Sequence, residues 1–213
     1  MFEKHKVKKA EELYKTQMDE WQSEHDELTA VLQAATTRQG SPSSKIVLKS
    51  GEAVFASING VSLVEDRRGA GHYAGRSQGF SIPVGSVGGR SVRYRVGANK
   101  GHFVQGDLHP TAVDQGELVI TNQRALFVGG KKTIECLFAK LVSAEVSDGE
   151  LALSVSNRQK VTRVHYGPKL DGWVQMRLTL AMSIARGDSD QFAAQIQEQL
   201  NELEAKRPQP VTT

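Results

Sequence analysis

Short runs of alternating apolar and polar residues, separated by turns of two to four residues, fill the middle of this chain. Strands joined by such short connections must pair antiparallel, because a parallel neighbour requires a crossover of about a dozen residues or more. The runs therefore predict an antiparallel meander. Its strands are expected over 117–121, 124–128, 133–138, 141–147, 150–156 and 161–166.

Four further strands are predicted upstream, over 53–58, 61–65, 91–96 and 102–108. The dipeptide Asn59-Gly60 separates the first two of them and indicates a tight hairpin, because both residues tolerate the positive φ of a type I′ turn. The stretch from Asp66 to Arg90 reads as an insertion-like, glycine-rich loop between strands.

Both ends of the chain have the period of a helix. No Pro or Gly occurs from Lys8 to Ala35, and apolar or aromatic residues, His25 among them, recur there at steps of three and four residues, which is the seam of a coiled coil or of a docked helix. This N-terminal seam contains Tyr14, Met18, Trp21, Leu28 and Leu32, and a C-terminal one contains Phe192, Ile196, Leu200 and Leu203.

Three segments follow from these patterns: an N-terminal helix over 1–36, a β-domain over 45–186 and a C-terminal helix over 188–207. The predicted fold class is α+β, with an antiparallel sheet capped by a helix over 173–184. Soluble monomers rarely leave stripes such as the two seams in water. Either the two helical arms pack on each other within one chain, or the same surfaces meet in a homo-oligomer.

Arginine is concentrated in the middle of the chain. Residues 40–177 carry 18 Lys and Arg against 11 Asp and Glu, whereas the remaining segments carry 9 against 13. Along residues 91–96, period two places two arginines on the face opposite Val92, Tyr94 and Val96. The resulting candidates for anion binding are Arg67, Arg68, Arg76, Arg90, Arg93, Arg95, Lys100 and Arg163. Ordinary solvated edge charge explains the same pattern equally well.

The stretch from Gly116 to Phe127, followed by Gly129-Gly130, resembles the strand-turn-strand core of bacterial PH-like domains of the GRAM type. The glycine-rich segment 76–97 resembles the part that precedes this core, and nearly the whole chain is similar to actinobacterial proteins with a helical N-terminus. The resemblance implies a PH-like β-barrel, a strongly bent antiparallel sheet closed at one corner by a C-terminal helix. It implies no catalytic residue, ligand or cofactor.

No motif with a defined chemistry accompanies this pattern. The segment 75–79 fits G-x-S-x-G, but Pro83 follows too closely for the helix that a serine hydrolase requires. The six histidines include no H-x-x-x-H pair and the single Cys136 has no companion, so we expect neither a metal nor another cofactor.

The sequence thus predicts a non-enzymatic interaction or scaffolding module that binds a protein or a second copy of itself, with no small-molecule substrate. The alternative is a peripheral membrane module whose Arg-rich face meets anionic lipid headgroups. Nucleic acid is disfavoured by the 6% aromatic content. The charged start of the chain favours the cytoplasm, with the membrane alternative at the inner face of the membrane.

Overall fold

The computed structural model describes residues 2–42, 46–70, 72–87 and 90–210. The chain divides into two compact units. The first unit comprises Met1–Val64 and Val113–Thr213, and the second comprises Glu65–Ala112. The elements follow in the order α1 (Phe2–Thr37), β1 (Val54–Arg68), β2 (His72–Val87), β3 (Arg90–Val104), β4 (Leu108–Thr121), β5 (Arg124–Gly129), β6 (Thr133–Leu137), the 3₁₀ turn η1 (Phe138–Lys140), β7 (Leu141–Ser147), β8 (Glu150–Val155), β9 (Thr162–His165), the 3₁₀ turn η2 (Pro168–Leu170), α2 (Asp171–Arg186) and α3 (Ser189–Ala205).

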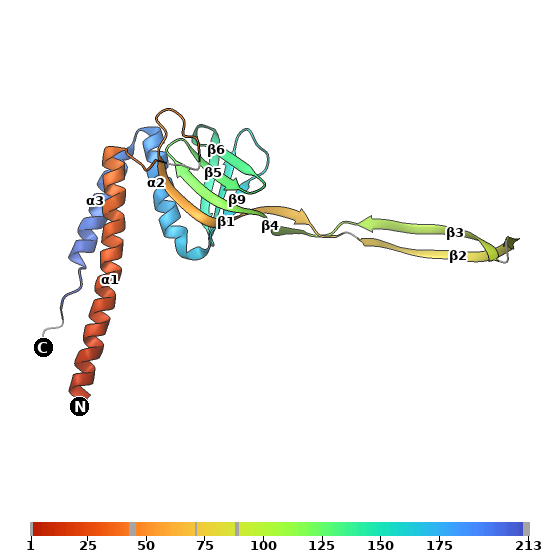
Figure 1. Ribbon diagram of the computed structural model, residues 1–213, viewed down its shortest axis with the longest axis horizontal. Helices are drawn as coiled ribbons and strands as arrows, with labels where there is room; N and C mark the ends of the chain where they lie inside the picture. The colour runs from red at the N-terminus through yellow and green to blue at the C-terminus, as the bar shows by residue number, and fades with distance from the viewer. Residues whose placement is uncertain (1, 43–45, 71, 88–89, 211–213) are drawn as a thin grey trace. The chain divides into compact units, whose positions relative to one another are not determined.

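Seven strands form one open antiparallel sheet in the order β6-β5-β4-β1-β9-β8-β7 (Figure 1). The predicted α+β class is confirmed. Strand β8 shows why the sheet forms here, because its side chains alternate between half-buried and buried along the whole strand. The turn before it, Asp148-Gly149, has positive φ at both residues (52° and 78°), as a tight hairpin between β7 and β8 requires.

The predicted continuous meander is wrong at one point. Strands β4 to β6 pair in succession and so do β7 to β9, but β6 and β7 lie at opposite ends of the strand order. The 3₁₀ turn η1 separates them, and its helical backbone cannot continue a ladder. Strand β1 joins the two halves, pairing with β9 through Ser62–Val64.

The predicted hairpin at Asn59-Gly60 is also wrong, because β1 runs through both residues. Gly60 has the positive φ that its sequence suggested, at 75°, but Asn59 is not among the described residues with positive φ. A type I′ turn needs both. One left-handed glycine inside a strand is typical of a β-bulge, which bends the strand instead of ending it.

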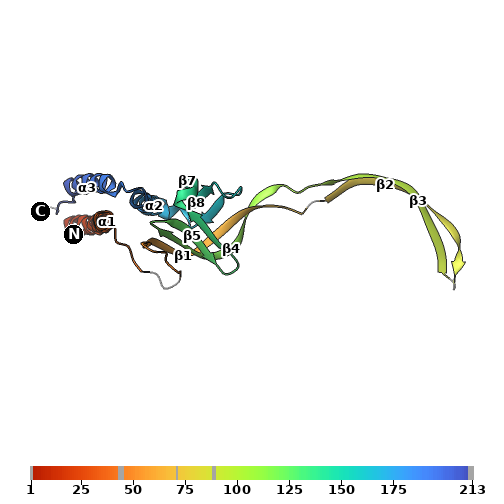
Figure 2. The same ribbon diagram turned by 90° about the horizontal axis from the view of Figure 1, so that it is seen from above.

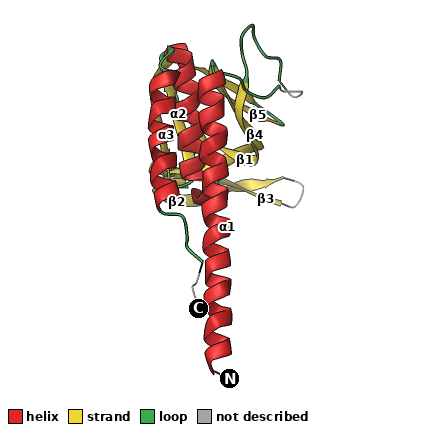
Figure 3. Cartoon of the chain, turned by 90° about the vertical axis from the view of Figure 1, so that its left-hand side faces the viewer, coloured by secondary structure: helices red, strands yellow, loops and turns green. Residues whose placement is uncertain are grey.

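The helices cover the sheet of the first unit. Figure 3 shows α1, α2 and α3 side by side, and Figure 2 shows α2 beside β7 and β8. The helix predicted over 173–184 lies within α2, whose Val174, Leu178, Leu180 and Ala181 are buried. They join one core with residues of the sheet, including Leu63, Leu118, Phe127, Leu151 and Val164. Among the described residues, no helix is long and apolar enough to cross a membrane.

The second unit is built around β2 and β3, which form a separate two-stranded antiparallel sheet. The loop expected between Asp66 and Arg90 is therefore mostly strand, and the turn expected between Val96 and His102 lies inside the continuous β3. The strand expected over 102–108 is interrupted, because β3 ends at Val104 and β4 begins at Leu108. A glycine-rich stretch has few side chains with which to show period two, so the sequence did not reveal these strands.

Candidate functional site

The structure distributes the candidate anion-binding residues over different environments. Arg67 and Arg68 are exposed at the end of β1. Arg163 is committed to an ion pair, because its Nε donates to Glu150 Oε1 at 2.7 Å. The side chains of the remaining candidates, Arg76, Arg90, Arg93, Arg95 and Lys100, lie outside the described residues.

The backbones of those remaining residues are in strands, so the placement of Arg76 and Arg90 in loops was wrong. Arg76 pairs with Lys100 across the β2–β3 ladder, whereas Arg93 pairs with Pro83. The anion-binding site over these candidates therefore stays a prediction.

The two predicted apolar seams meet within one chain. Trp21 and Leu28 of α1 are buried, and so are Phe192, Ile196 and Leu200 of α3. Leu32 and Leu203 are half-buried and pack against the same core. Tyr14 and Met18, nearer the start of α1, are also half-buried.

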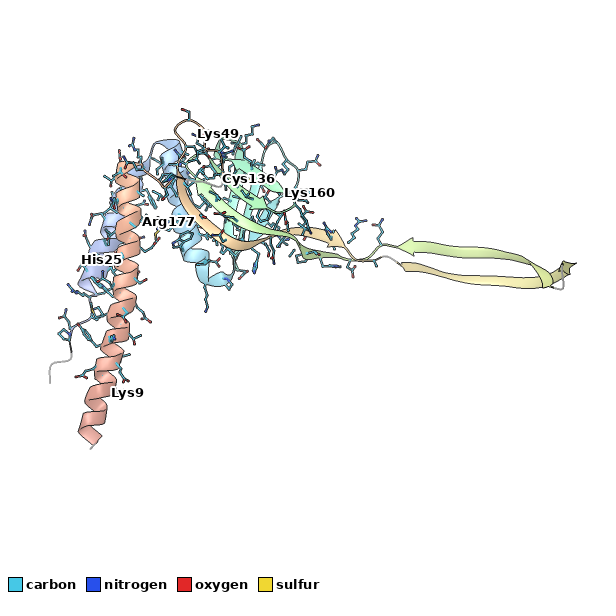
Figure 4. All side chains as sticks on the ribbon, in the orientation of Figure 1. Lys9, His25, Lys49, Cys136, Lys160 and Arg177 are labelled. Carbon is cyan, nitrogen blue, oxygen red and sulfur yellow. The ribbon has the colours of Figure 1, made fainter. Side chains whose placement is uncertain are left out.

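Polar contacts fix the two helices antiparallel. Trp21 Nε1 donates to the carbonyl of Leu203 at 2.9 Å, and Arg38 at the other end bonds Ser189 and Asp190. His25, labelled in Figure 4, lies between these ends, stacked on Trp21 with its Nε2 3.2 Å from Glu204 Oε1.

The motif Thr121-Asn122-Gln123-Arg124 holds together the turn between β4 and β5. Thr121, fully buried, accepts hydrogen bonds at Oγ1 from the backbone N–H groups of Gln123 and Arg124, and donates to Glu52 Oε1 at 2.8 Å. Asn122 spans the adjacent loop, accepting from the N–H of Ala53 and donating to the carbonyl of Gly51. The motif is thus a structural clamp on the loop that precedes β1.

Arg124 is the centre of this clamp. Its Nε and one terminal nitrogen hold both oxygens of Glu52 at 2.6 and 2.9 Å, and its other terminal nitrogen binds Glu135 at 2.7 Å. Lys49, on the loop marked in Figure 4, binds the same oxygen of Glu135. The Glu52 side chain is completely buried, so this pair replaces the water that its carboxylate loses.

The clamp also sets the charge state of its acids. Burial alone would raise the pKa of the Glu52 carboxyl, but hydrogen bonds from Arg124, the Lys49 backbone and Thr121 outweigh it and hold that pKa below its ordinary value. Hydrogen bonds from Lys49 and Arg124 lower the pKa of Glu135 as well. Both groups are therefore anions that neutralise Arg124, and four of its five N–H donors already bond Glu52, Glu135 and the carbonyl of Val47.

A groove of about 740 Å³ opens beside this turn, between β7 and α2. Strand β7 supplies its first four residues, Leu141–Ala144, and α2 supplies Leu178 and Met182 from the opposite wall. Asn122 and Gln123, positioned by the clamp, close one end. The groove exists because η1 separates β6 from β7 and leaves the sheet open at this place.

The floor of the groove is apolar and its rim is polar. Leu137, Phe138 and Leu141 are half-buried, while Val142 keeps 70% of its surface exposed. Thr179, Gln175 and Ser143 lie around them. Val142 therefore extends the half-buried apolar lining with one exposed apolar side chain.

Strand β7 also presents an unpaired backbone edge. It pairs with β8 on one side, from Leu141–Val155 to Ser147–Glu150, and no described strand pairs with its other side. Alternate N–H and C=O groups of an edge strand point away from the sheet and are available to a further strand. The ladder is irregular between Leu141 and Ser143, at the exposed Val142.

The lining offers little for catalysis. Among the described residues that line the groove, Arg186 alone is charged, and its Nε bonds Asp188 at 3.0 Å. No three His, Cys, Asp or Glu within the described parts of the chain are grouped to hold a metal ion. The groove can therefore bury apolar groups of a ligand and form hydrogen bonds with it through the backbone of β7.

Sequence reasoning did not find this groove. It depends on the break between β6 and β7, and the sequence there, Phe138-Ala139-Lys140, resembles an ordinary short connection. One signal was available: Leu141 and Val142 are adjacent apolar residues, which a strand with one solvated face does not need.

No protein-family model, curated protein or solved structure matches this chain.

Proposed function

We propose that this protein is a non-enzymatic interaction module that binds an extended peptide of a partner protein in the groove between β7 and α2. The observation that carries the proposal is the coincidence of an unpaired strand edge and an apolar floor along the same four residues, Leu141–Ala144. A peptide added as a further strand gains main-chain hydrogen bonds from β7, and alternate side chains enter the groove.

The chemistry of the groove favours a peptide over a small polar ligand. Specific sites for small molecules place a few charged or polar groups so that they converge on the ligand. Here Arg186 is already paired with Asp188, and the other polar groups lie on the rim. A partner with apolar side chains at alternate positions satisfies both the floor and the backbone edge.

We also propose that the seven-stranded sheet is a PH-like fold. The strand order supports this, because β4–β6 and β7–β9 form two three-stranded meanders joined through β1, and α2 packs against the same core. The hairpin of β2 and β3 is then an insertion between the first two strands of that fold. The resemblance of residues 116–127 to GRAM-type domains agrees with this order.

The experiment uses a library of random peptides displayed on phage, selected against the full chain. Selected peptides, synthesised and measured by calorimetry, should carry apolar residues at alternate positions. Val142→Glu should weaken their binding at least about tenfold, because the complex would place a carboxylate against the apolar floor. Val161→Glu is the matched control, since Val161 is also an exposed valine but does not line the groove.

Equal binding of the selected peptides to the two variants would contradict the groove as the site. The membrane alternative is tested in parallel with vesicles of phosphatidylserine and phosphatidylcholine. Flotation of the protein with these vesicles, lost on changing Arg67 and Arg68 to Glu, together with no selected peptide, would replace the peptide proposal with the membrane one.

A further inference from the structure

The first half of α1 extends past its neighbour α3. Helix α3 ends at Ala205, and the Trp21–Leu203 hydrogen bond marks where its end meets α1. Residues 2–20 of α1 therefore extend about 28 Å further at 1.5 Å per residue. Figure 3 shows α1 continuing beyond α2 and α3 towards the N-terminus.

This overhang, residues 2–20, carries an uncovered continuation of the apolar seam. Tyr14 and Met18 of the seam are only half-buried, and Leu13 beside the seam keeps 59% of its surface exposed. A helix of this length has little stability of its own in water, and most helical stability in proteins comes from packing an apolar face. Packing of a second helix against this apolar face would therefore stabilise the overhang.

The charges of the overhang indicate the identity of its partner helix. Residues 2–9 hold four lysines and one glutamate, a net charge of +3, whereas residues 10–20 hold four acidic residues and one lysine, a net charge of −3. Lysines in the first turns of a helix also oppose its dipole, which favours anions there. When two copies lie antiparallel over residues 2–20, the basic residues 2–9 of one copy lie against residues 13–20 of the other, which include Asp19 and Glu20, while Glu11 and Glu12 lie at the centre of the pair. A parallel arrangement opposes like charges along the whole overhang.

We propose that residues 2–20 of α1 pair antiparallel with the same residues of a second copy, so that the chain forms a homodimer. The two copies bury the Tyr14 and Met18 face against each other, and the opposed charge blocks fix the direction of pairing. This inference does not depend on the groove between β7 and α2.

The test measures the mass of the full-length protein by analytical ultracentrifugation. The wild type should be a dimer. Its dissociation constant should rise when the salt concentration is raised from about 0.05 M to about 0.5 M. One variant carries Lys6→Glu with Lys9→Glu, which makes both blocks acidic. The other carries Asp19→Lys with Glu20→Lys, which makes both blocks basic. Each alone should dimerise at least about tenfold more weakly, because like charges then oppose.

An equimolar mixture of the two variants should restore the dimer, because an overhang with a net charge of −4 then meets one with a net charge of +4. The control, Lys169→Glu with Glu198→Lys, changes exposed charges elsewhere and should dimerise as the wild type does. A mixed disulfide between Glu3→Cys of one copy and Gln17→Cys of the other, in excess over either homodisulfide, should report the antiparallel direction, because residues near the two ends of the overhang meet only in that arrangement. A monomeric wild type, variants as dimeric as the wild type, a mixture that stays monomeric, or predominant homodisulfides would overturn the proposal.

Discussion

Arg124 shows how one residue of a sequence motif shapes a site that it does not line. Its guanidinium neutralises the fully buried Glu52 and the half-buried Glu135, and this holds the turn that closes one end of the groove. The resemblance of residues 116–127 to a domain core drew attention to the motif. The partners of Arg124 lie 72 and 11 positions away, so no local pattern could have named them.

Removing Arg124 should therefore be costly. Arg124→Ala leaves the Glu52 carboxylate buried without its partner, and we expect the free energy of unfolding to fall by about 3 kcal/mol. Lys49→Ala removes a partly exposed ion pair with Glu135 but keeps the backbone N–H that binds Glu52, and should cost less than about 1 kcal/mol. Urea unfolding measures both. Equal losses would mean that Arg124 is no more than a surface charge.

The same residues predict how stability responds to acid. The pKa values of Glu52 and Glu135 are lowered in the folded state, so their ionised forms stabilise the fold above the unfolded pKa of about 4.3. This stability is lost as the pH falls through the lowered folded-state pKa values. Chemical unfolding between about pH 6 and pH 3 should show a steep decline, flatter in Glu135→Gln. An identical slope in that variant would show that Glu135 does not contribute.

At the scale of elements, the apolar seam of α1 passes through two packing environments. From Trp21 onwards it packs on α3 and the core, and before Trp21 it extends alone. The heptad steps predicted a buried stripe, but they could not separate these halves because the repeat is continuous across them.

Two leucines of α1 test this division. Leu28 is 4% exposed and Leu13 is 59% exposed, and both substitutions to Ala keep the helix propensity nearly unchanged. We expect Leu28→Ala to lower the free energy of unfolding by about 3 kcal/mol and Leu13→Ala by less than about 0.5 kcal/mol. Thermal or urea unfolding at a protein concentration that keeps the chain monomeric makes the comparison. A reversed order would show that α1 packs through a different face.

Other elements mark the limits of sequence reasoning. Alternation predicted β8 and β9 well, because their side chains alternate between buried and more exposed positions. It failed at Gly60, where a bulge and a turn require the same residue type, and at β6 and β7, where pairing depends on distant strands. The groove arises from that second failure, so the candidate site could not be predicted from local patterns.

On the scale of the whole molecule, the chain combines a packed unit with an inserted hairpin. The buried apolar residues described for the first unit come from residues 21–64 and 118–200. In the second unit, none of residues 65–70 and 105–112, whose side chains the structure describes, is buried. At the base of the hairpin, the N–H of Gly69 donates to the carbonyl of Asp107 at 3.0 Å, so the two ends are adjacent.

Deletion of the hairpin should therefore leave the first unit folded. Joining Gly69 to Asp107 through Asn-Gly in place of residues 70–106 removes β2 and β3 and provides the turn that adjacent strands require. We expect the melting temperature to change by no more than a few degrees, because the core is unaltered. Calorimetry of the shortened chain measures this. Loss of a cooperative transition would show that the hairpin is part of the folding unit.

The central claim is that the free edge of β7 accepts an extended peptide, and amide hydrogen exchange tests it most directly. A peptide selected against the full chain is added, and exchange is followed by NMR at every backbone amide. We predict slowed exchange at alternate amides between Leu141 and Ser147, with smaller changes along the facing side of α2. Protection confined to β6, to α1 or to the β2–β3 hairpin, with β7 unchanged, would contradict the claim.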